Sequence, residues 1–316
     1  MAGAQSPFDA LTLKLYYPSR FTDSVEERST GVVRPDSSRS PFPVVILLPD
    51  EDLSLESYGW LASELAQAGS AVVTYSWVHE DGDGLVRPGP GLQRKRLSRK
   101  RFGKKPSCPA LPAVFSALKK MNRSGVLANH LNLSCTVLGG HGQGGRMALL
   151  NANRDWFPTV CGAFAYGSHV LADPEQGWDK RDVFPLEPDM SMLLIGGTND
   201  GVIDAETAYL AGKDASSTWA VQHSFNRGIK GKRGDRHLVL VEGASHYNFA
   251  APRDPTTGKE FLDRRARGQG KSVRKYLAQL LVVFCDQTCR GDPMTTADLK
   301  ALCDSSHPMV AHAESK

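Results

Sequence analysis

Short runs of apolar residues alternate along the chain with longer segments in which apolar residues recur at helical spacing. The runs at residues 43–48 and 71–75 are continuous and rich in β-branched residues, as is typical of strands buried on both faces. Similar runs lie at residues 11–17, 135–138, 160–165, 192–195 and 238–241. Helical periodicity marks residues 58–68, 109–121, 143–152 and 272–284. This alternation predicts an α/β protein with a mostly parallel central sheet and helices on both faces.

One domain accounts for most of the chain. Its 316 residues exceed the usual size of a domain, but α/β folds often form larger single units. Hydrophobic residues make up 41% and charged residues 23%, which excludes a wholly disordered protein. We assign residues 1–286 to the domain, with a polar and basic excursion at residues 79–106. Residues 287–316 form a C-terminal tail, a candidate mobile segment.

The positive charge is concentrated in one segment. The chain has a net charge of +4, and eight basic residues fall between Arg94 and Lys105, so the rest of the chain is net acidic. A nucleic-acid-binding domain usually spreads basic residues over a face and interleaves aromatic ones, whereas Phe102 is the only aromatic residue in this segment. We interpret it as a solvated surface loop. The alternative is contact with an anionic surface or a nucleic acid.

The cysteines and the N-terminus do not indicate a secreted protein. The six cysteines have neither the paired spacing of a metal site nor the pattern of a disulfide framework in a chain of this length. The first residues lack the basic and apolar regions of a signal peptide, and no apolar run is long enough to span a membrane. We therefore expect a reducing, cytoplasmic setting.

The segment 136–145 (TVLGGHGQGG) combines a buried strand, a glycine-rich turn and the start of a helix. It resembles the nucleophile elbow of the α/β-hydrolase superfamily, G-x-S-x-G, which many esterases carry as G-H-S-x-G-G. The matching residues are Gly140, His141, Gly144 and Gly145. Gln143 fills the variable position, and Gly142 stands where the nucleophilic serine would be. A Rossmann-type phosphate loop is the alternative, but no acidic residue ends the following strand.

Two further residues follow later strands in the order of this superfamily, which is nucleophile, acid and histidine. Asp200 comes after the run at residues 192–195, and His246 comes after the run at residues 238–241. The carboxyl ends of parallel strands share one edge of a sheet, so we expect these residues to meet Gly142 there. The resemblance implies that Asp200 and His246 are the acid and the histidine of a catalytic triad.

Within the superfamily, the chain resembles the branch of dienelactone hydrolases and platelet-activating-factor-acetylhydrolase-like esterases. The shared features are residues 16–18 (YYP), residues 43–49, residues 55–69, the R-G-D-R sequence at 233–236, and Phe249. The resemblance covers roughly residues 11–284. It implies serine-hydrolase ancestry, a pocket for a small apolar or ester-like ligand at the strand ends, and no cofactor.

Two parts of this machinery are altered. Gly142 has no side-chain atom that could attack a carbonyl carbon, so covalent catalysis at this position is excluded. After Pro49, where family members commonly carry the glycine of the oxyanion loop, the chain has Asp50 and Glu51. Carboxylates there oppose a negative oxyanion, whose stabilisation is often the largest catalytic contribution. To the oxyanion loop and the pocket we assign Asp50, Glu51, His141 and Gln143.

Three hypotheses about function follow. The first is a pseudoenzyme that has lost hydrolysis but keeps the pocket for binding or regulation. The second is an enzyme that uses His246 and Asp200 without a covalent intermediate, as a lyase, an isomerase or a water-activating hydrolase. The third is a nucleophile-knockout form of an active carboxylic ester hydrolase.

Two other arrangements are weaker. Ser168 follows the run at residues 160–165 and would be a relocated nucleophile, but it lies one strand away from the elbow. We expect no metal site, because the candidate ligands have no regular spacing. These ligands are Asp50, Asp52, His141 and His246.

Overall fold

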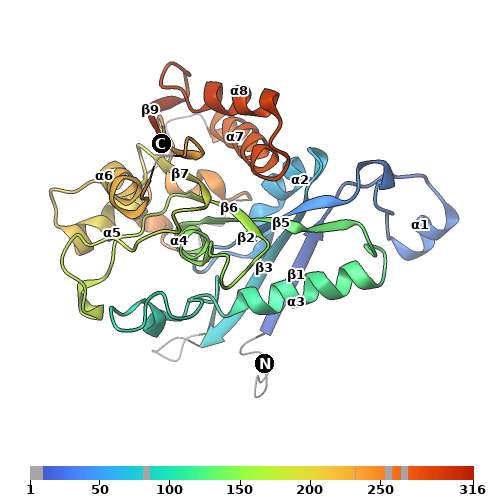
Figure 1. Ribbon diagram of the computed structural model, residues 1–316, viewed down its shortest axis with the longest axis horizontal. Helices are drawn as coiled ribbons and strands as arrows, with labels where there is room; N and C mark the ends of the chain where they lie inside the picture. The colour runs from blue at the N-terminus through green and yellow to red at the C-terminus, as the bar shows by residue number, and fades with distance from the viewer. Residues whose placement is uncertain (1–9, 81–85, 232, 253–257, 265–269) are drawn as a thin grey trace.

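The computed structural model of the protein describes residues 10–80, 86–231, 233–252, 258–264 and 270–316. Within these residues, one mixed sheet of nine strands forms the centre of the molecule (Figure 1). Its six middle strands are parallel. In spatial order they are β3 (Ala71–Glu80), β2 (Phe42–Leu48), β5 (Leu131–His141), β6 (Val160–Tyr166), β7 (Ser191–Gly197) and β8 (Arg236–Val241). The predicted α/β class with a mostly parallel sheet is confirmed.

Three antiparallel strands border these six. β1 (Ala10–Tyr16) and β4 (Val86–Gly89) both pair with β3, and β9 (Val310–Ser315) pairs with β8 at the opposite edge. β5 is longer than the predicted run at residues 135–138. Its ends contain polar residues and two glycines, which give no apolar signal although their backbones pair in the sheet.

The pleat of the strands divides their side chains between two buried faces. In β2, Val44, Ile46 and Leu48 belong to one hydrophobic cluster, and Val45 and Leu47 belong to another. Every residue of β2 is buried, which explains why its sequence is continuously apolar rather than alternating. The sheet therefore needs helices on both sides.

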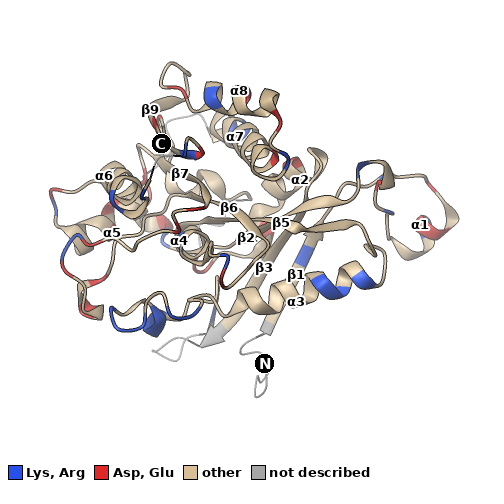
Figure 2. Cartoon of the chain, in the orientation of Figure 1, with Lys and Arg blue, Asp and Glu red and all other residues tan. Residues whose placement is uncertain are grey.

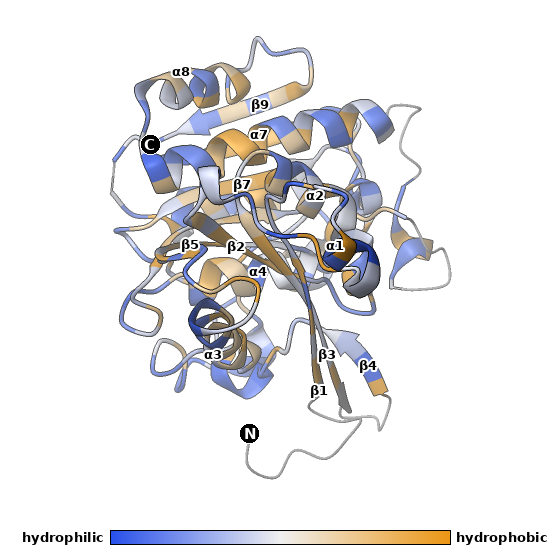
Figure 3. Cartoon of the chain, turned by 90° about the vertical axis from the view of Figure 1, so that its right-hand side faces the viewer, coloured by the Kyte–Doolittle hydropathy of each residue, from blue (hydrophilic) through white to orange (hydrophobic). Residues whose placement is uncertain are grey.

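Helices cover each face of the sheet. The first cluster includes side chains of α3 (Ala110–Arg123), α4 (Gly142–Asn151) and α6 (Ser217–His223). The second includes side chains of α2 (Gly59–Gln67), α7 (Gly270–Arg290) and α8 (Pro293–Leu302). Figure 3 shows the two groups on opposite sides of the sheet, with α3 and α4 on one side and α2, α7 and α8 on the other.

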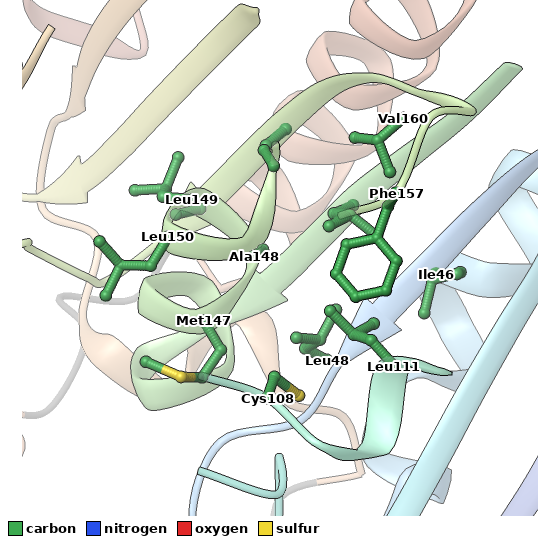
Figure 4. Packing of buried hydrophobic residues seen from close by; sticks show 14 of the residues in the cluster. Ile46, Leu48, Cys108, Leu111, Met147, Ala148, Leu149, Leu150, Phe157 and Val160 are labelled. Atoms are coloured by element: carbon green, nitrogen blue, oxygen red, sulfur yellow. The ribbon is translucent and has the colours of Figure 1, made fainter. Parts of the chain in front are cut away.

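The core around α4 is closely packed. Met147, Ala148 and Leu149 project from this helix into a cluster with Leu48 of β2 and Leu111 of α3 (Figure 4). All five residues are almost completely buried. Because α4 begins directly after β5, this packing fixes the position of the turn between the two elements.

The remaining helices are mostly short. α5 (Gly201–Ala211) packs against α6 through a smaller apolar cluster, and α1 (Val25–Thr30) begins with a capping box formed by Ser24 and Glu27. Single turns of 3-10 helix are η1 (Ser37–Arg39), η2 (Leu55–Tyr58), η3 (Arg94–Leu97), η4 (Pro174–Gln176), η6 (His246–Phe249) and η7 (Glu260–Leu262), and η5 (Ser224–Gly228) is a π-helical turn. Helices α1, α5 and α6 were not predicted.

The C-terminal segment differs from the prediction. Residues 287–316, which we set apart as a tail, contain the last turn of α7, then α8, and finally β9. β9 pairs with β8 over most of that strand, and Leu299 of α8 is buried against α7. The segment thus completes the sheet and belongs to the domain. β9 (VAHAES) contains mostly polar and small residues, and most of its side chains are only half-buried at the edge of the sheet.

The basic excursion begins inside the sheet. β3 extends to Glu80, and β4 folds back on it from Val86, so the first part of the expected excursion is a hairpin. Residues 81–85 lie outside the described residues. After β4 the chain leaves the sheet through η3 and returns to it with α3.

One disulfide corrects the expectation from the cysteine pattern. Cys135 in β5 and Cys289 in α7 are bonded, although they are 154 residues apart in the sequence. A pairing at this distance has no local signature, so the spacing of the cysteines did not reveal it. The free cysteines are Cys108, Cys161, Cys285 and Cys303. Among the described helices, none is long and apolar enough to cross a membrane.

The order of the strands reverses direction next to β2. From β2 the chain crosses to β3 on one side, and it later returns to β5 on the other side. In open α/β sheets, ligands bind at the carboxyl ends of the strands at such a point. The ends of β2 and β5 are therefore the first place to look for a site.

Candidate functional site

Four strand ends bring the predicted site residues together. Asp50 follows β2, Gly142 follows β5, Asp200 follows β7 and His246 follows β8. The intervening strand β6 ends beside Gly167. The structure thus places Asp50, Gly142, Asp200 and His246 in one buried cluster, as we expected from their positions after the strands.

His246 lies between two carboxylates. Its Nδ1 is 3.0 Å from Oδ2 of Asp200, and its Nε2 is 3.1 Å from Oδ2 of Asp50. His246 and Asp200 are at most 1% exposed, and Asp50 is 8% exposed. The side chain of Asp200 also accepts a hydrogen bond from the backbone of Ile203, which caps α5 and fixes the carboxylate. The result is a continuous hydrogen-bonded chain, Asp200–His246–Asp50.

The carboxylate of Asp50 occupies the space next to Gly142. A Cβ atom at residue 142 would lie 2.3 Å from both Cγ and Oδ1 of Asp50, so no larger residue fits unless Asp50 moves. Gly142 has a φ of +51°, the left-handed conformation that glycine adopts without strain. The amide of Gln143 donates a hydrogen bond of 2.7 Å to Oδ1 of Asp50. Asp50 therefore contacts both the histidine and the amide that follows the expected nucleophile position.

A second glycine leaves room for the His246 pair. Gly167 has a φ of +53°, and a Cβ atom there would lie 2.9 Å from both Oδ2 of Asp200 and Nδ1 of His246. Any side chain at this position would press on the hydrogen bond between these two atoms.

The charges in this cluster are complementary. Burial opposes the protonated ring of His246, but the charges and hydrogen bonds of Asp200 and Asp50 outweigh it and hold the pKa of His246 well above its usual value. Burial likewise opposes ionisation of Asp50, but the hydrogen bond with His246 and the charge of that ring keep the pKa of Asp50 below its usual value. We conclude that an imidazolium and an ionised Asp50 form an ion pair at neutral pH.

His141 has a different role. Its Nδ1 is 3.3 Å from the hydroxyl of Tyr58, and its Nε2 is 3.1 Å from the backbone oxygen of His246. Burial, followed by the charge of His246, lowers the pKa of His141 to about 3, so its ring is neutral. The Tyr58 hydroxyl also accepts a hydrogen bond from the amide of Asp50. His141 and Tyr58 thus hold the loop after β2 and the loop after β8 in place.

The cluster is a poor metal site. Asp50, His141 and His246 have potential ligand atoms within 4.8 Å of one another, but each ring nitrogen of both histidines already has a hydrogen-bond partner. A metal would have to displace the ion pair and turn His141. Asp52, also considered from the sequence, pairs with Arg87 of β4 at 3.0 Å and lies apart from this group.

The glycine-rich turn also fits the spacing of a dinucleotide-binding loop, G-x-G-x-x-G. In such loops the phosphate binds at the N-terminus of the following helix. Here the negative carboxylate of Asp50 accepts the hydrogen bond from Gln143 at the start of α4. A phosphate would meet like charge there, which argues against this alternative.

Some organising residues were not found from the sequence. The carboxylate of Asp263 accepts hydrogen bonds from the amides of His246, Tyr247 and Gly201, and so joins the loops that carry His246 and Asp200. Neither Asp263 nor Tyr58 stands in a recognisable motif. Their importance depends on contacts between segments that are distant in the sequence.

Other predicted residues lie outside the cluster. Ser168 is buried, and its hydroxyl has no hydrogen-bond partner among the described residues, but both ring nitrogens of His246 are occupied by carboxylates. Within the R-G-D-R sequence, Arg236 is buried at the start of β8, at the opposite end of the strand from His246. Phe249 stacks on Tyr166 with ring centroids 4.9 Å apart, beneath His141 and Tyr58.

A cavity of about 350 Å³ adjoins the cluster. Glu51 and Gln143, the neighbours of Asp50 and Gly142, are both in its wall. Its apolar lining comes from Leu92, Leu97, Phe184, Ala205, Leu210 and Leu262, and its charged lining from Glu51, Arg94, Arg146, Asp173, Glu206 and Lys259. The predicted strand-end pocket is thus more strongly charged than a site for a purely apolar ligand.

The basic segment forms one rim of this cavity. The indole of Trp178 donates a hydrogen bond of 2.8 Å to the backbone of Leu97, and Arg99 pairs with Asp179 at 3.1 Å. Figure 2 shows the basic residues of this segment gathered around η3. Most of their side chains point to solvent, whereas Leu97 is buried in the core.

No protein-family model and no curated protein matches this chain.

Proposed function

We propose that this protein is a non-hydrolytic binding protein with the fold and ancestry of an α/β-hydrolase, in which Asp50 takes the place of the nucleophile. The observation that supports this proposal is the double contact of the Asp50 carboxylate, with the ring of His246 and with the amide of Gln143. The order of the site residues along the chain and their places at the strand ends support the ancestry.

The geometry of Asp50 explains the loss of hydrolysis. In a serine hydrolase, the histidine bonds to the serine oxygen, and the amide after the serine stabilises the oxyanion. In this chain one oxygen of Asp50 bonds to the histidine and the other bonds to that amide. A substrate carbonyl would have to displace a buried, ionised carboxylate from both positions. Loss of the nucleophile alone costs about a factor of 10⁶ in kcat.

The same geometry disfavours a noncovalent enzyme that uses His246 as a base. The hydrogen bond from His246 to Asp200 supports that hypothesis, since it orients the ring. However, the raised pKa of His246 keeps both ring nitrogens protonated at neutral pH, and a base needs one of them free. His246 is also fully buried.

The third hypothesis, a knockout of an otherwise working esterase, requires that serine fit at residue 142. The Cβ atom of a serine there would collide with Asp50. We therefore treat the glycine at 142 and the aspartate at 50 as matched.

Hydrolysis of p-nitrophenyl butyrate by four proteins tests the proposal: the natural chain, Gly142→Ser, Asp50→Gly, and the double variant with both changes. We expect the first three to show only background hydrolysis. The double variant should hydrolyse the ester at least about 100-fold faster than Gly142→Ser. Removing Asp50 frees the Gln143 amide, and one oxyanion-hole donor is worth a factor of this order in rate.

Three results would count against it. Turnover by the natural chain that His246→Ala abolishes would support the noncovalent enzyme. Activity of Gly142→Ser alone would show that Asp50 does not block the site. A double variant that folds but remains inert would contradict the hydrolase-like geometry.

A further inference from the structure

We propose that the cavity beside Asp50 binds a small amphiphile whose acidic head group, a phosphate monoester or a carboxylate, contacts Arg146. The inference rests on the proposed function, because a protein that does not hydrolyse a substrate would use this cavity to hold a ligand. The head group is assigned from the polar atoms of the wall, and the tail from its apolar side chains.

Arg146 is a cation of the cavity wall whose hydrogen bonds are incomplete among the described residues. It projects from α4 into the wall of the cavity, with its guanidinium carbon 5.3 Å from the centre of the Phe184 ring. Its Nη2 donates to the backbone oxygen of Leu171 at 2.5 Å. Its Nε is buried and has no hydrogen-bond partner in the described part of the chain. Arginine is always charged, so this group favours a negatively charged acceptor.

The acidic residues of the wall are already engaged elsewhere. Glu206 lies 2.8 Å from the ammonium of Lys259 and 3.6 Å from the ring of His169. Asp173 caps η4 by accepting the amide of Glu175. The amide hydrogen bond leaves the charge of Asp173 in place, but neither carboxylate forms an ion pair with Arg146, whose guanidinium can therefore bind an anion.

Glu51 completes this balance at the other side of the cavity. Its carboxylate lies 3.8 Å from Arg94 and 3.9 Å from Lys259. Glu51 and Glu206, which an anion near Arg146 would face, are therefore both paired with cations.

A second unmatched atom favours a phosphate monoester. Oε1 of Gln176, which also lines the cavity, is buried without a hydrogen-bond partner among the described residues. A monoanionic phosphate ester offers acceptor oxygens to Arg146 and one hydroxyl to Gln176, whereas a carboxylate satisfies the arginine alone. We therefore expect the phosphate to bind more tightly than the carboxylate.

The other part of the wall suits a short hydrocarbon chain. Leu97, Phe184 and Leu210 are buried in the core and also line the cavity. The volume of about 350 Å³ is near the lower end for ligand pockets, so the tail is expected to be short. Binding would bury this chain against apolar side chains and place the head group at the charged end.

Calorimetric titration of the natural protein with four octyl compounds tests the inference. They are octyl phosphate, octanoate, octanol and octyltrimethylammonium, each below its critical micelle concentration. We expect both anions to bind at least tenfold more tightly than octanol, octyl phosphate more tightly than octanoate, and the ammonium compound not to bind. The tighter of the two anions identifies the head group.

Arg146→Gln should weaken binding of the anions by tenfold or more. Arg101→Gln is the matched control, because it removes the same charge from the exposed basic segment outside the cavity wall. Circular dichroism of both variants shows whether they fold.

The inference is overturned if neither anion binds the natural protein, if octanol binds as tightly, or if a folded Arg146→Gln variant keeps full affinity. The titrations on the natural protein decide the question even if that variant does not fold. Esterase assays report on the proposed function separately. If the anions do not bind while hydrolysis stays at background, the proposed class of ligand is rejected, whereas the proposal of a non-hydrolytic site is retained.

Discussion

The ring of His246 is flanked by two buried carboxylates, an arrangement with more negative charge than a catalytic triad has. Under the proposed function, Asp200 corresponds to the acid of a triad, and Asp50 adds a second anion on the side where a neutral serine would stand. An imidazolium neutralises part of this charge inside the protein. The buried ring is thus held as one half of an ion pair.

We predict that His246 stays protonated well above pH 6.5 and that Asp50→Asn lowers its pKa. The measurement is the pH dependence of its ring nitrogens in ¹⁵N NMR spectra. The substitution removes the charge that helps to raise the pKa, while Asp200 remains. His141, with a pKa of about 3, should remain neutral across the same range and serve as an internal reference. An unchanged titration of His246 in Asp50→Asn would contradict the ion pair.

The same pair sets the direction of the pH dependence of stability. The pKa of His246 is raised on folding, so its contribution is complete below the unfolded value of about 6.5 and is lost as the pH rises through the native value. The pKa of Asp50 is lowered on folding, so its contribution is present above about pH 3.8 and is lost as the pH falls through the native value. Urea unfolding at several pH values should show that Asp50→Asn weakens both dependences.

Gly167→Ala should destabilise the protein more than Gly31→Ala. Both glycines have a positive φ, but a Cβ at residue 31 would meet no atom within 4 Å, whereas one at residue 167 would press on Asp200 and His246. The backbone strain of about 1–2 kcal/mol is common to both, and only Gly167→Ala adds the cost of disturbing the buried pair. Urea unfolding measures the difference. Equal losses for the two variants would show that the space beside His246 is not tight.

At the residue scale, the sequence predicts which groups meet but not what they do to one another. Asp200, His246 and Gly142 follow strands, and the parallel sheet brings them together. From its position after Pro49, we expected Asp50 only to oppose an oxyanion. Its hydrogen bonds were not predicted, because the conformation of the loop after β2 has no local signature. In the structure its carboxylate accepts the hydrogen bond of the Gln143 amide itself. That contact depends on Tyr58 and His141, which come from two other segments.

At the scale of elements, buried strands were easier to predict than exposed ones. β2, β6, β7 and β8 have continuous apolar runs, since both of their faces are covered. β9 has no such run, because it lies at the edge of the sheet and its register is given by pairing with β8. The prediction of a separate tail arose from this weak pattern.

The substitution Glu314→Pro tests the importance of β9. The amide of Lys316 donates to the backbone oxygen of Arg236, and the two-residue period of a strand then directs the amide of Glu314 to β8 as well. Proline removes this donor, and we expect a loss of about 1–3 kcal/mol in the free energy of unfolding. Glu314→Ala is the control and should change stability little. Equal stability of both variants would mean that the C-terminal segment is dispensable.

The basic segment between Arg94 and Lys105 is a second element with a testable role. If it binds anionic surfaces, replacing Lys95, Arg101 and Lys104 by glutamine should reduce sedimentation with vesicles rich in anionic lipid. The effect should shrink as salt increases. The matched control removes the same charge from exposed positions of α3, with glutamine at 119, 120 and 123.

The control variant should bind as the natural protein does. Binding that ignores salt, or that both variants lose equally, would reject a specific role for the segment. Titration with single-stranded RNA under the same conditions separates the nucleic-acid alternative from the lipid surface.

For the molecule as a whole, the disulfide changes the expected setting. Cys135 and Cys289 join the central strand β5 to the helix that covers it. Disulfides persist mainly in oxidising compartments, which is at odds with the reducing setting expected from the sequence. The segment that the bond closes spans 154 residues, and closing a loop of this length stabilises a fold by up to about 5 kcal/mol in the chain-entropy account.

Titration of thiols in the unfolded protein gives a direct measurement of this bond. Without reductant, we expect the four free cysteines to react, and with reductant all six. Reduction should also lower the melting temperature, and Cys161→Ser, which removes a free thiol, should not abolish this shift. If the bond forms, β5 is held against α7 near the middle of the strand. The stability of the sheet that supports the Asp50–His246 pair would then depend on the redox state of the compartment. If all six thiols react without reductant, the bond is absent, and the reducing setting expected from the sequence stands.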